Sequence, residues 1–158
     1  MIEWTESNTE LIIYCDALLS GLSFVAPHLR LGSYALIPDN PPLQTLFYFE
    51  ALCICATILW ASGSNLPMHQ LLIFTDSLNC VEMFNSLSAK EGYNELLLFV
   101  IRILITTNIS LHIFHVPGAD NVVADALSCN LPVVAAASLP GLQIHMFEPP
   151  HKAMGQDK

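Results

Sequence analysis

The sequence predicts an α/β fold with a five-stranded mixed sheet and helices on both faces. Three short apolar runs come first and are separated by turn residues, a pattern typical of an antiparallel meander. Further strand-like runs then alternate with longer helical segments, which indicates two parallel strands with helices packed on the sheet. The length of 158 residues fits one domain rather than two.

Turn-forming residues delimit the predicted meander. Its three strands are expected at residues 11–15, 21–26 and 29–37. The first run ends at Asp16, Pro27 stops the second, and Pro38-Asp39-Asn40-Pro41-Pro42 closes the third. Breakers at these positions favour short connections between neighbouring strands.

The rest of the chain divides by segment length. Helices are expected at residues 44–61, 77–87, 94–107 and 121–128, and strands at residues 71–75 and 111–116. Residues 130–158 contain four prolines and are predicted to form a loosely packed tail. The expected organisation is thus a lead over residues 1–10, a domain over residues 11–129 and a Pro-rich tail from residue 130.

The composition excludes several classes of protein. Hydrophobic residues make up 53% of the chain and charged residues 12%, which excludes a disordered chain. Residues 51–75 lack a charged side chain, but Ser62-Gly63-Ser64-Asn65 and Pro67 interrupt them, so we expect no membrane span. No signal peptide is expected, because glutamates occupy the region where one would lie. The five cysteines lie in apolar surroundings, which favours buried thiols and an intracellular location.

Four of the fourteen acidic residues occupy unusual positions. Asp16 and Asp76 each end an apolar strand, Glu50 lies within an apolar helix, and Asp125 lies among apolar residues. A buried charge is unfavourable unless it is paired or binds a metal ion. One such acid alone would more often be a helix cap or a surface residue. Four of them without basic neighbours predict a site for hard divalent cations such as Mg²⁺.

Each of these acids lies in a recognisable segment. The segments are Ile-Tyr-Cys-Asp-Ala at 13–17, Phe-Glu-Ala-Leu at 49–52, Phe-Thr-Asp-Ser at 74–77 and His-Val-Pro-Gly-Ala-Asp-Asn-Val-Val-Ala-Asp-Ala-Leu-Ser at 115–128. Together they resemble the ribonuclease H domain of retrotransposon reverse transcriptases, in the family's order and over residues 11–129. The resemblance is strongest to gypsy-like and tyrosine-recombinase (DIRS-type) elements, the latter common in fungi.

The resemblance implies a ribonuclease H-like fold and metal-dependent cleavage of the RNA strand of an RNA–DNA hybrid. It implies that Asp16, Glu50, Asp76 and Asp125 bind two Mg²⁺ ions, with Mn²⁺ as a substitute. It also implies that His115 transfers a proton or helps product release, whereas the residues alone equally allow a strand-end histidine before a Pro-Gly turn. The implied partners are the hybrid and a reverse-transcriptase polymerase domain.

Two functions from different classes remain open. The first is an endonuclease of RNA–DNA hybrids, which the four acids favour. The second is a catalytically silent ribonuclease H-like module that packs against a polymerase domain or another protein. The net charge of −9 with five Lys and Arg residues favours the second, because nucleic-acid binding depends on cations. Relatives in this group usually carry Arg where Cys129 stands here.

Overall fold

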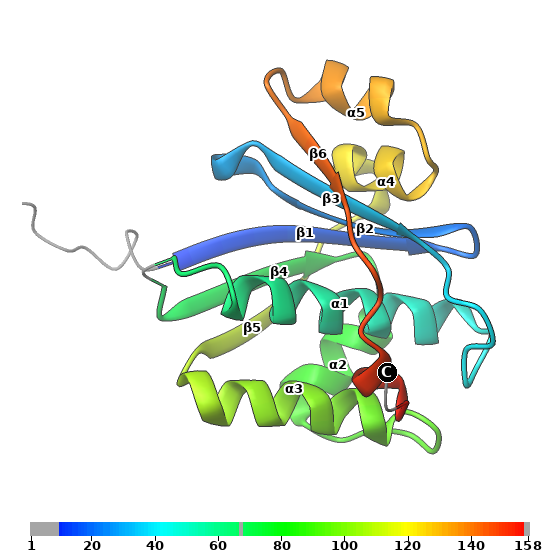
Figure 1. The fold of residues 1–158 in the computed structure, drawn as a ribbon. Helices are drawn as coiled ribbons and strands as arrows, with labels where there is room; N and C mark the ends of the chain where they lie inside the picture. The colour runs from blue at the N-terminus through cyan, green and yellow to red at the C-terminus, as the bar shows by residue number, and fades with distance from the viewer. Residues whose placement is uncertain (1–9, 67, 157–158) are drawn as a thin grey trace, which may run out of the picture.

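The computed structural model describes residues 10–66 and 68–156. Within them lies a six-stranded mixed sheet in the order β5-β4-β1-β2-β3-β6 (Figure 1). The strands are β1 (Glu10–Leu18), β2 (Gly21–Ala26), β3 (Leu31–Leu36), β4 (Gln70–Thr75), β5 (Ser110–His115) and β6 (Gln143–Met146). The helices are α1 (Leu46–Ser62), α2 (Leu78–Ser86), α3 (Asn94–Thr107), α4 (Val122–Ser128) and α5 (Pro132–Ser138), with 3-10 turns η2 (Pro27–Leu29), η3 (Gly118–Asp120) and η4 (His151–Met154).

The predicted meander and the two parallel strands are confirmed. β1, β2 and β3 are antiparallel neighbours, β4 runs parallel to β1, and β5 runs parallel to β4. The pairing of β1 with β4 ends at Tyr14, but its pairing with β2 continues to Leu18. Asp16 therefore lies within β1, opposite Ser23, and does not end the strand. The apolar run ends at Asp16, whereas the hairpin pairing passes beyond it.

The predicted strand number is wrong, because the structure has six strands and not five. β6 pairs in parallel with β3 and thereby covers an edge whose backbone groups would otherwise stay unpaired. A loosely packed tail is also wrong for residues 130–156, since α5 packs on α4 and η4 packs on α3. Ala153 and Met154 are buried in the main core. The prolines flank β6 without entering it, so proline content did not indicate the strand. The boundary at residue 129 stays a prediction.

Helices cover both faces of the sheet, as the sequence predicts. α1, α2 and α3 lie on one side, and α4 and α5 lie on the other (Figure 1). α1 is apolar on nearly all sides because it is enclosed between β1, α3 and η4. Thr45 caps its N-terminus, with Oγ1 accepting a hydrogen bond from the Tyr48 amide at 3.2 Å. No helix of residues 10–66 and 68–156 is long and apolar enough to cross a membrane.

The two faces are covered to different extents. α4 has only seven residues, and it packs against β1, β2 and β3. Its small core consists of Val25, Ala124, Ala126, Leu127 and Ala135. The principal strand contacts of α4 are with β1, β2 and β3, so on this side no helix of the described residues covers β4 and β5.

Candidate active site

The four predicted carboxylates come from four elements that meet at one edge of the sheet. Asp16 lies in β1, Asp76 directly follows β4, Glu50 is on α1, and Asp125 is on α4. The side chains influence one another's ionisation: Asp76 and Asp125 both raise the pKa of Asp16, and Asp76 raises the pKa of Glu50. The structure therefore brings the predicted set together as electrostatic neighbours.

Asp16 is the buried member of this set. It is 6% exposed, and Oδ2 accepts a hydrogen bond from the Ser128 hydroxyl at 2.9 Å. Burial, and then the charges of Asp76 and Asp125, raise the pKa of Asp16 to about 7, while the Ser128 hydrogen bond lowers it. An ionised Asp16 thus lies in an unfavourable environment that a bound cation would relieve.

Glu50 and Asp76 face each other from α1 and the end of β4. Burial raises the pKa of Glu50, the Ser77 hydroxyl lowers it, and the charge of Asp76 raises it. The Ser77 hydroxyl also caps α2, accepting a hydrogen bond from the Cys80 amide at 3.3 Å. Asp76 itself is exposed. A Cβ atom added at Gly118 would lie 3.3 Å from Asp76 Oδ2, so the turn after β5 approaches Asp76 closely.

Buried polar side chains hold α4 against the sheet and so place Asp125. Asn121 donates through Nδ2 to the Cys15 carbonyl at 2.7 Å, and the Ser23 hydroxyl donates to the Ala124 carbonyl. Ser128 contacts Asp16 from the last turn of the helix. Asn121, Ser23 and Ser128 are not among the site residues predicted from the sequence. Asn121 and Ser128 nevertheless lie within the fourteen-residue segment, which could have identified them.

His115 lies at the same edge of the sheet as Asp76. It is the last residue of β5, it is opposite Thr75 in the register, and its side chain is exposed. The amide of Val116 donates to the Thr75 carbonyl at 2.9 Å, which fixes the end of β5 beside the end of β4. This position is compatible with both interpretations of His115, so its role stays a prediction.

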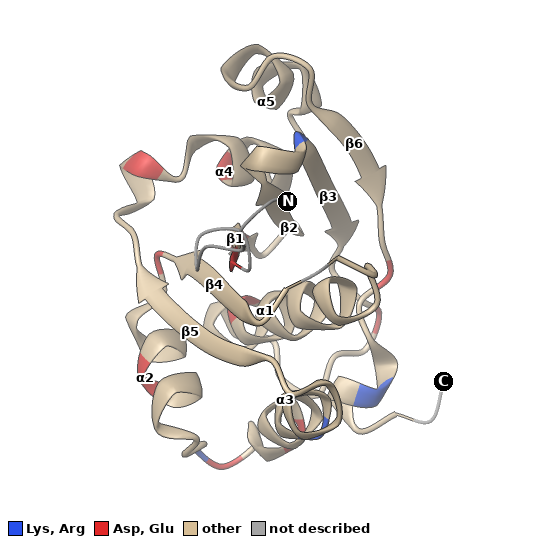
Figure 2. Ribbon diagram, turned by 90° about the vertical axis from the view of Figure 1, so that its left-hand side faces the viewer, with Lys and Arg blue, Asp and Glu red and all other residues tan. Residues whose placement is uncertain are grey.

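Basic side chains lie on other elements. Arg30 follows η2 and donates to the Pro140 carbonyl, Arg102 is on α3, and Lys152 is in η4. Figure 2 shows the Lys and Arg residues on these outer elements and on the loop after α2. No described Lys or Arg contributes to the pKa of Asp16 or Glu50. The repulsion among the carboxylates is therefore not offset by basic groups of the described chain.

The donor set fits a hard cation, although the carboxylates do not form a closed ligand sphere. Within residues 10–66 and 68–156, no three His, Cys, Asp or Glu side chains lie close enough together to hold a metal ion among them. Mg²⁺ is commonly bound through one or two carboxylates, with water and substrate phosphate completing its octahedron. The four acids fit an ion of that kind.

Comparisons with known proteins were made by sequence and by structure. The sequence matches no protein-family model and no curated protein. The structure is similar to LC11-RNase H1 in complex with an RNA/DNA hybrid, with a TM-score of 0.59, 20% identity, and coverage of 74% of this chain and 92% of that chain. It is also similar to RNase H1 from the halophilic archaeon Halobacterium salinarum, with a TM-score of 0.60, 16% identity, and coverage of 77% and 96%.

A third similar structure is the N-terminal RNase H domain of a Mycobacterium tuberculosis protein. Its TM-score is 0.60 at 17% identity, with coverage of 82% of this chain and 98% of that domain. Identities this low establish the fold and not the activity. The chain therefore has a ribonuclease H-like α/β fold, and that part of the predicted resemblance is confirmed.

Proposed function

We propose that the chain is a metal-dependent endonuclease that cleaves the RNA strand of RNA–DNA hybrids. In this proposal it is the ribonuclease H part of a retroelement reverse transcriptase, or a relic of one, and it acts inside the cell. The supporting observation is that, on a ribonuclease H-like fold, the charges of Asp76 and Asp125 act on Asp16 and the charge of Asp76 acts on Glu50, with no described basic side chain contributing. Such a set has no evident structural use, because its members destabilise one another in the absence of cations.

The four acids would hold two Mg²⁺ ions, or Mn²⁺ in their place, and these ions supply an activated water and stabilise the leaving oxygen of a phosphodiester. Ser128 holds one oxygen of the Asp16 carboxylate by a hydrogen bond. His115, exposed beside the end of β4, is the proposed residue for proton transfer or product release. Gly118 has no Cβ, and a Cβ atom there would lie 3.3 Å from Asp76 Oδ2, so the glycine leaves room for this carboxylate.

Hybrid binding is the weaker half of the proposal. The net charge is −9, with five Lys and Arg in the whole chain. Because phosphate neutralisation supplies much of the affinity for nucleic acids, the chain needs cations from elsewhere. A reverse-transcriptase polymerase domain, joined or associated, is the proposed source, since a linked domain adds its affinity through effective concentration.

A catalytically silent module is the second candidate. The observation that favours it is that the carboxylates, as placed, are not close enough for three of the described side chains to share an ion. A silent module would keep the fold and the docking surfaces but would show no metal-dependent hydrolysis.

The deciding experiment is cleavage of a labelled RNA–DNA hybrid with Mg²⁺, with Mn²⁺ and with EDTA. Duplex DNA and single-stranded RNA serve as substrate controls. Asp76→Asn should abolish cleavage, and Asp39→Asn, which removes an exposed charge far from the site in sequence, should not. Cleavage that persists in Asp76→Asn comes from another nuclease. The absence of cleavage in all metals, by a folded chain that has a polymerase domain attached, would favour the silent module.

A further inference from the structure

An apolar surface lies on the face of the sheet opposite α1, and within the described residues α4 reaches it only at β1. In β1, β4 and β5, alternate residues enter the main core, among them Leu11, Ile13, Leu71, Ile73 and Ile113. The intervening residues point to the other face and stand in register across the three strands. This outer face consists of Ile12, Leu72 and His112 in one row and Tyr14, Phe74 and Phe114 in the next.

The aromatic row is continuous across the strands. The ring centroids of Tyr14 and Phe74 are 5.0 Å apart, and those of Phe74 and Phe114 are 5.4 Å apart, with the rings stacked in both pairs. Phe114 is 43% exposed. Parallel strands are usually buried on both faces, and contiguous exposed apolar surface commonly marks an interaction site. Within the described residues, no further layer covers the β4 and β5 part of the outer face, where His112 and Phe114 are exposed and Leu72 and Phe74 are half-buried.

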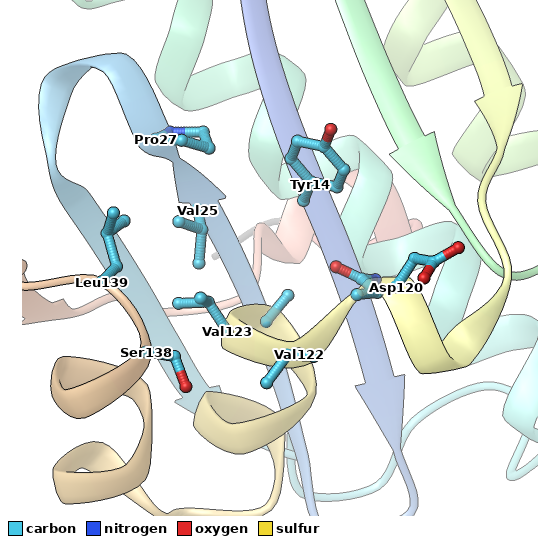
Figure 3. A pocket seen from close by; sticks show the side chains of 10 residues that line it. Tyr14, Val25, Pro27, Asp120, Val122, Val123, Ser138 and Leu139 are labelled. Atoms are coloured by element: carbon cyan, nitrogen blue, oxygen red, sulfur yellow. The ribbon is translucent and has the colours of Figure 1, made fainter.

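A groove extends the outer face toward α4 and α5. It has a volume of about 590 Å³, and Tyr14 belongs both to the groove and to the aromatic row. Figure 3 shows Val25, Pro27, Val123 and Leu139 around it, with Asp120 at one end. The outer face and the groove thus form one apolar surface that runs from β5 to α5.

The charges around this surface decide what it can bind. β1, β4, β5 and α4 contain no Lys or Arg, whereas Glu10, Asp76 and Asp120 carry negative charge at the margins. A nucleic acid would find a single described Lys or Arg here, Arg30 beside the Pro27 and Leu139 end of the groove, and its guanidinium already donates to the Pro140 carbonyl. The stacked rings already occupy one another's flat sides. A second copy of the chain would bring the same acidic margin. A protein with an apolar centre and a basic rim is complementary to the surface.

We propose that the outer face and the groove dock a basic protein domain, and that this is the polymerase domain of the proposed function, on which the identity of the partner rests. Phe74 lies two residues before Asp76, and Phe114 directly precedes His115. A domain seated on these rings borders the carboxylate edge. Its basic rim then lies where the phosphates of a hybrid at that edge need cations.

The test is a binding measurement with a purified gypsy-like polymerase domain that lacks its own ribonuclease H part. Isothermal titration calorimetry with the full chain gives the Kd at several salt concentrations. We expect Phe114→Ser to raise the Kd by about tenfold or more, as for a central aromatic contact. Ile105→Ser is the matched control, because Ile105 is 77% exposed on α3, on the other side of the sheet, and should leave the Kd unchanged.

A charge pair of variants tests the basic rim independently of the rings. His112 is exposed in the outer face, so His112→Lys should weaken binding and His112→Glu should strengthen it, and both effects should shrink at high salt. Circular dichroism and melting curves establish that each variant is folded.

Several results would overturn the docking proposal. They are the absence of binding, equal losses in Phe114→Ser and Ile105→Ser, or the opposite order of the two His112 variants. Dimerisation of the chain that Phe114→Ser abolishes would make a second copy the occupant, and loss of hybrid binding by Phe114→Ser without the polymerase domain would make it a nucleic acid. Hybrid cleavage at high Mg²⁺ is measured separately, by the chain alone and by the chain with the polymerase domain attached. Docking without cleavage would refute the proposed nuclease activity but not the proposed docking surface. Cleavage without docking would refute only the docking surface.

Discussion

Asp16→Asn should stabilise the metal-free chain at neutral and alkaline pH. Asp16 is 6% exposed, and burial together with Asp76 and Asp125 makes its ionised form unfavourable in the folded state. Asparagine has nearly the same shape and carries an oxygen that can still accept the hydrogen bond from Ser128. The substitution thus removes the buried charge and keeps the contact, while it removes a proposed ligand of the metal ions.

The size of the effect follows from the pKa. The folded chain raises the pKa of Asp16 from 3.8 to about 7, so folding favours the protonated carboxyl. The stability from this group is fully present below pH 3.8 and is lost as the pH rises to about 7. The whole difference corresponds to about 4 kcal/mol. Asp16→Asn should therefore be nearly neutral at pH 4 and should gain up to about 4 kcal/mol over the parent at pH 8.

Urea unfolding in EDTA at pH 4, 6 and 8 measures this difference as a free energy of unfolding. Asp39→Asn is the control, since it lowers the net negative charge equally but at an exposed position. Two results would refute the idea that the ionised Asp16 destabilises the folded chain. They are a gain in the free energy of unfolding that does not depend on pH, and an equal gain in Asp39→Asn. Adding Mg²⁺ should reverse the order of the two proteins, because only the parent keeps Asp16 as a ligand.

Four further outcomes are expected. Millimolar Mg²⁺ should raise the melting temperature of the parent, by mass action on the folded state, and Asp76→Asn should blunt that rise in thermal melts. His115→Ala should slow single-turnover cleavage by about 10²–10⁴-fold at most, since general acid–base assistance is seldom larger. Truncation after Cys129 removes β6 and the buried Met154 and should lower the free energy of unfolding by at least about 3 kcal/mol in urea titrations. In Ca²⁺, a salt series of hybrid binding by the chain alone should give a slope of only two or three phosphate contacts, at about 0.9 per contact.

The order of strands and helices could be predicted because it follows from local features, namely the turn residues and the lengths of the segments between them. The apolar run that forms β4 and the long apolar segment that forms α1 are recognisable without any knowledge of their neighbours. β6 could not be predicted in this way, because it has four residues, of which only Ile144 and Met146 are strongly apolar. Its stability comes from the free edge of β3 and from the packing of Ile144 near α4. Such support depends on contacts between distant parts of the chain.

The sequence singles out the acids of the candidate site, whose role as metal ligands stays a prediction, but not the polar residues that support them. An acid in an apolar run is conspicuous, which is why Asp16 and Asp125 stand out in the sequence. Ser128 and Asn121 are ordinary polar residues, and their roles depend on α4 lying across β1. The outer face could not be predicted from the sequence for a related reason. Phe74 and Phe114 have the pattern of core residues, and only the short length of α4 shows that it does not cover them. Periodicity gives the direction of a side chain but not whether anything covers it.

The acidic edge and the outer face have a common physical explanation. Two bound Mg²⁺ ions would offset four of the nine net negative charges and leave −5, so metal binding does not make the chain attractive to phosphates. A rearrangement of the chain's own basic side chains would not supply many cations either. Arg30, for example, already donates a hydrogen bond to the Pro140 carbonyl, on the turn between α5 and β6. If the chain binds a hybrid as proposed, a second protein surface held close to Asp76 would supply the cations. The only part of the described sheet that borders this edge and lacks a covering helix is the face formed by β4 and β5. A module that depends on a partner for its affinity would need a docking surface at that position.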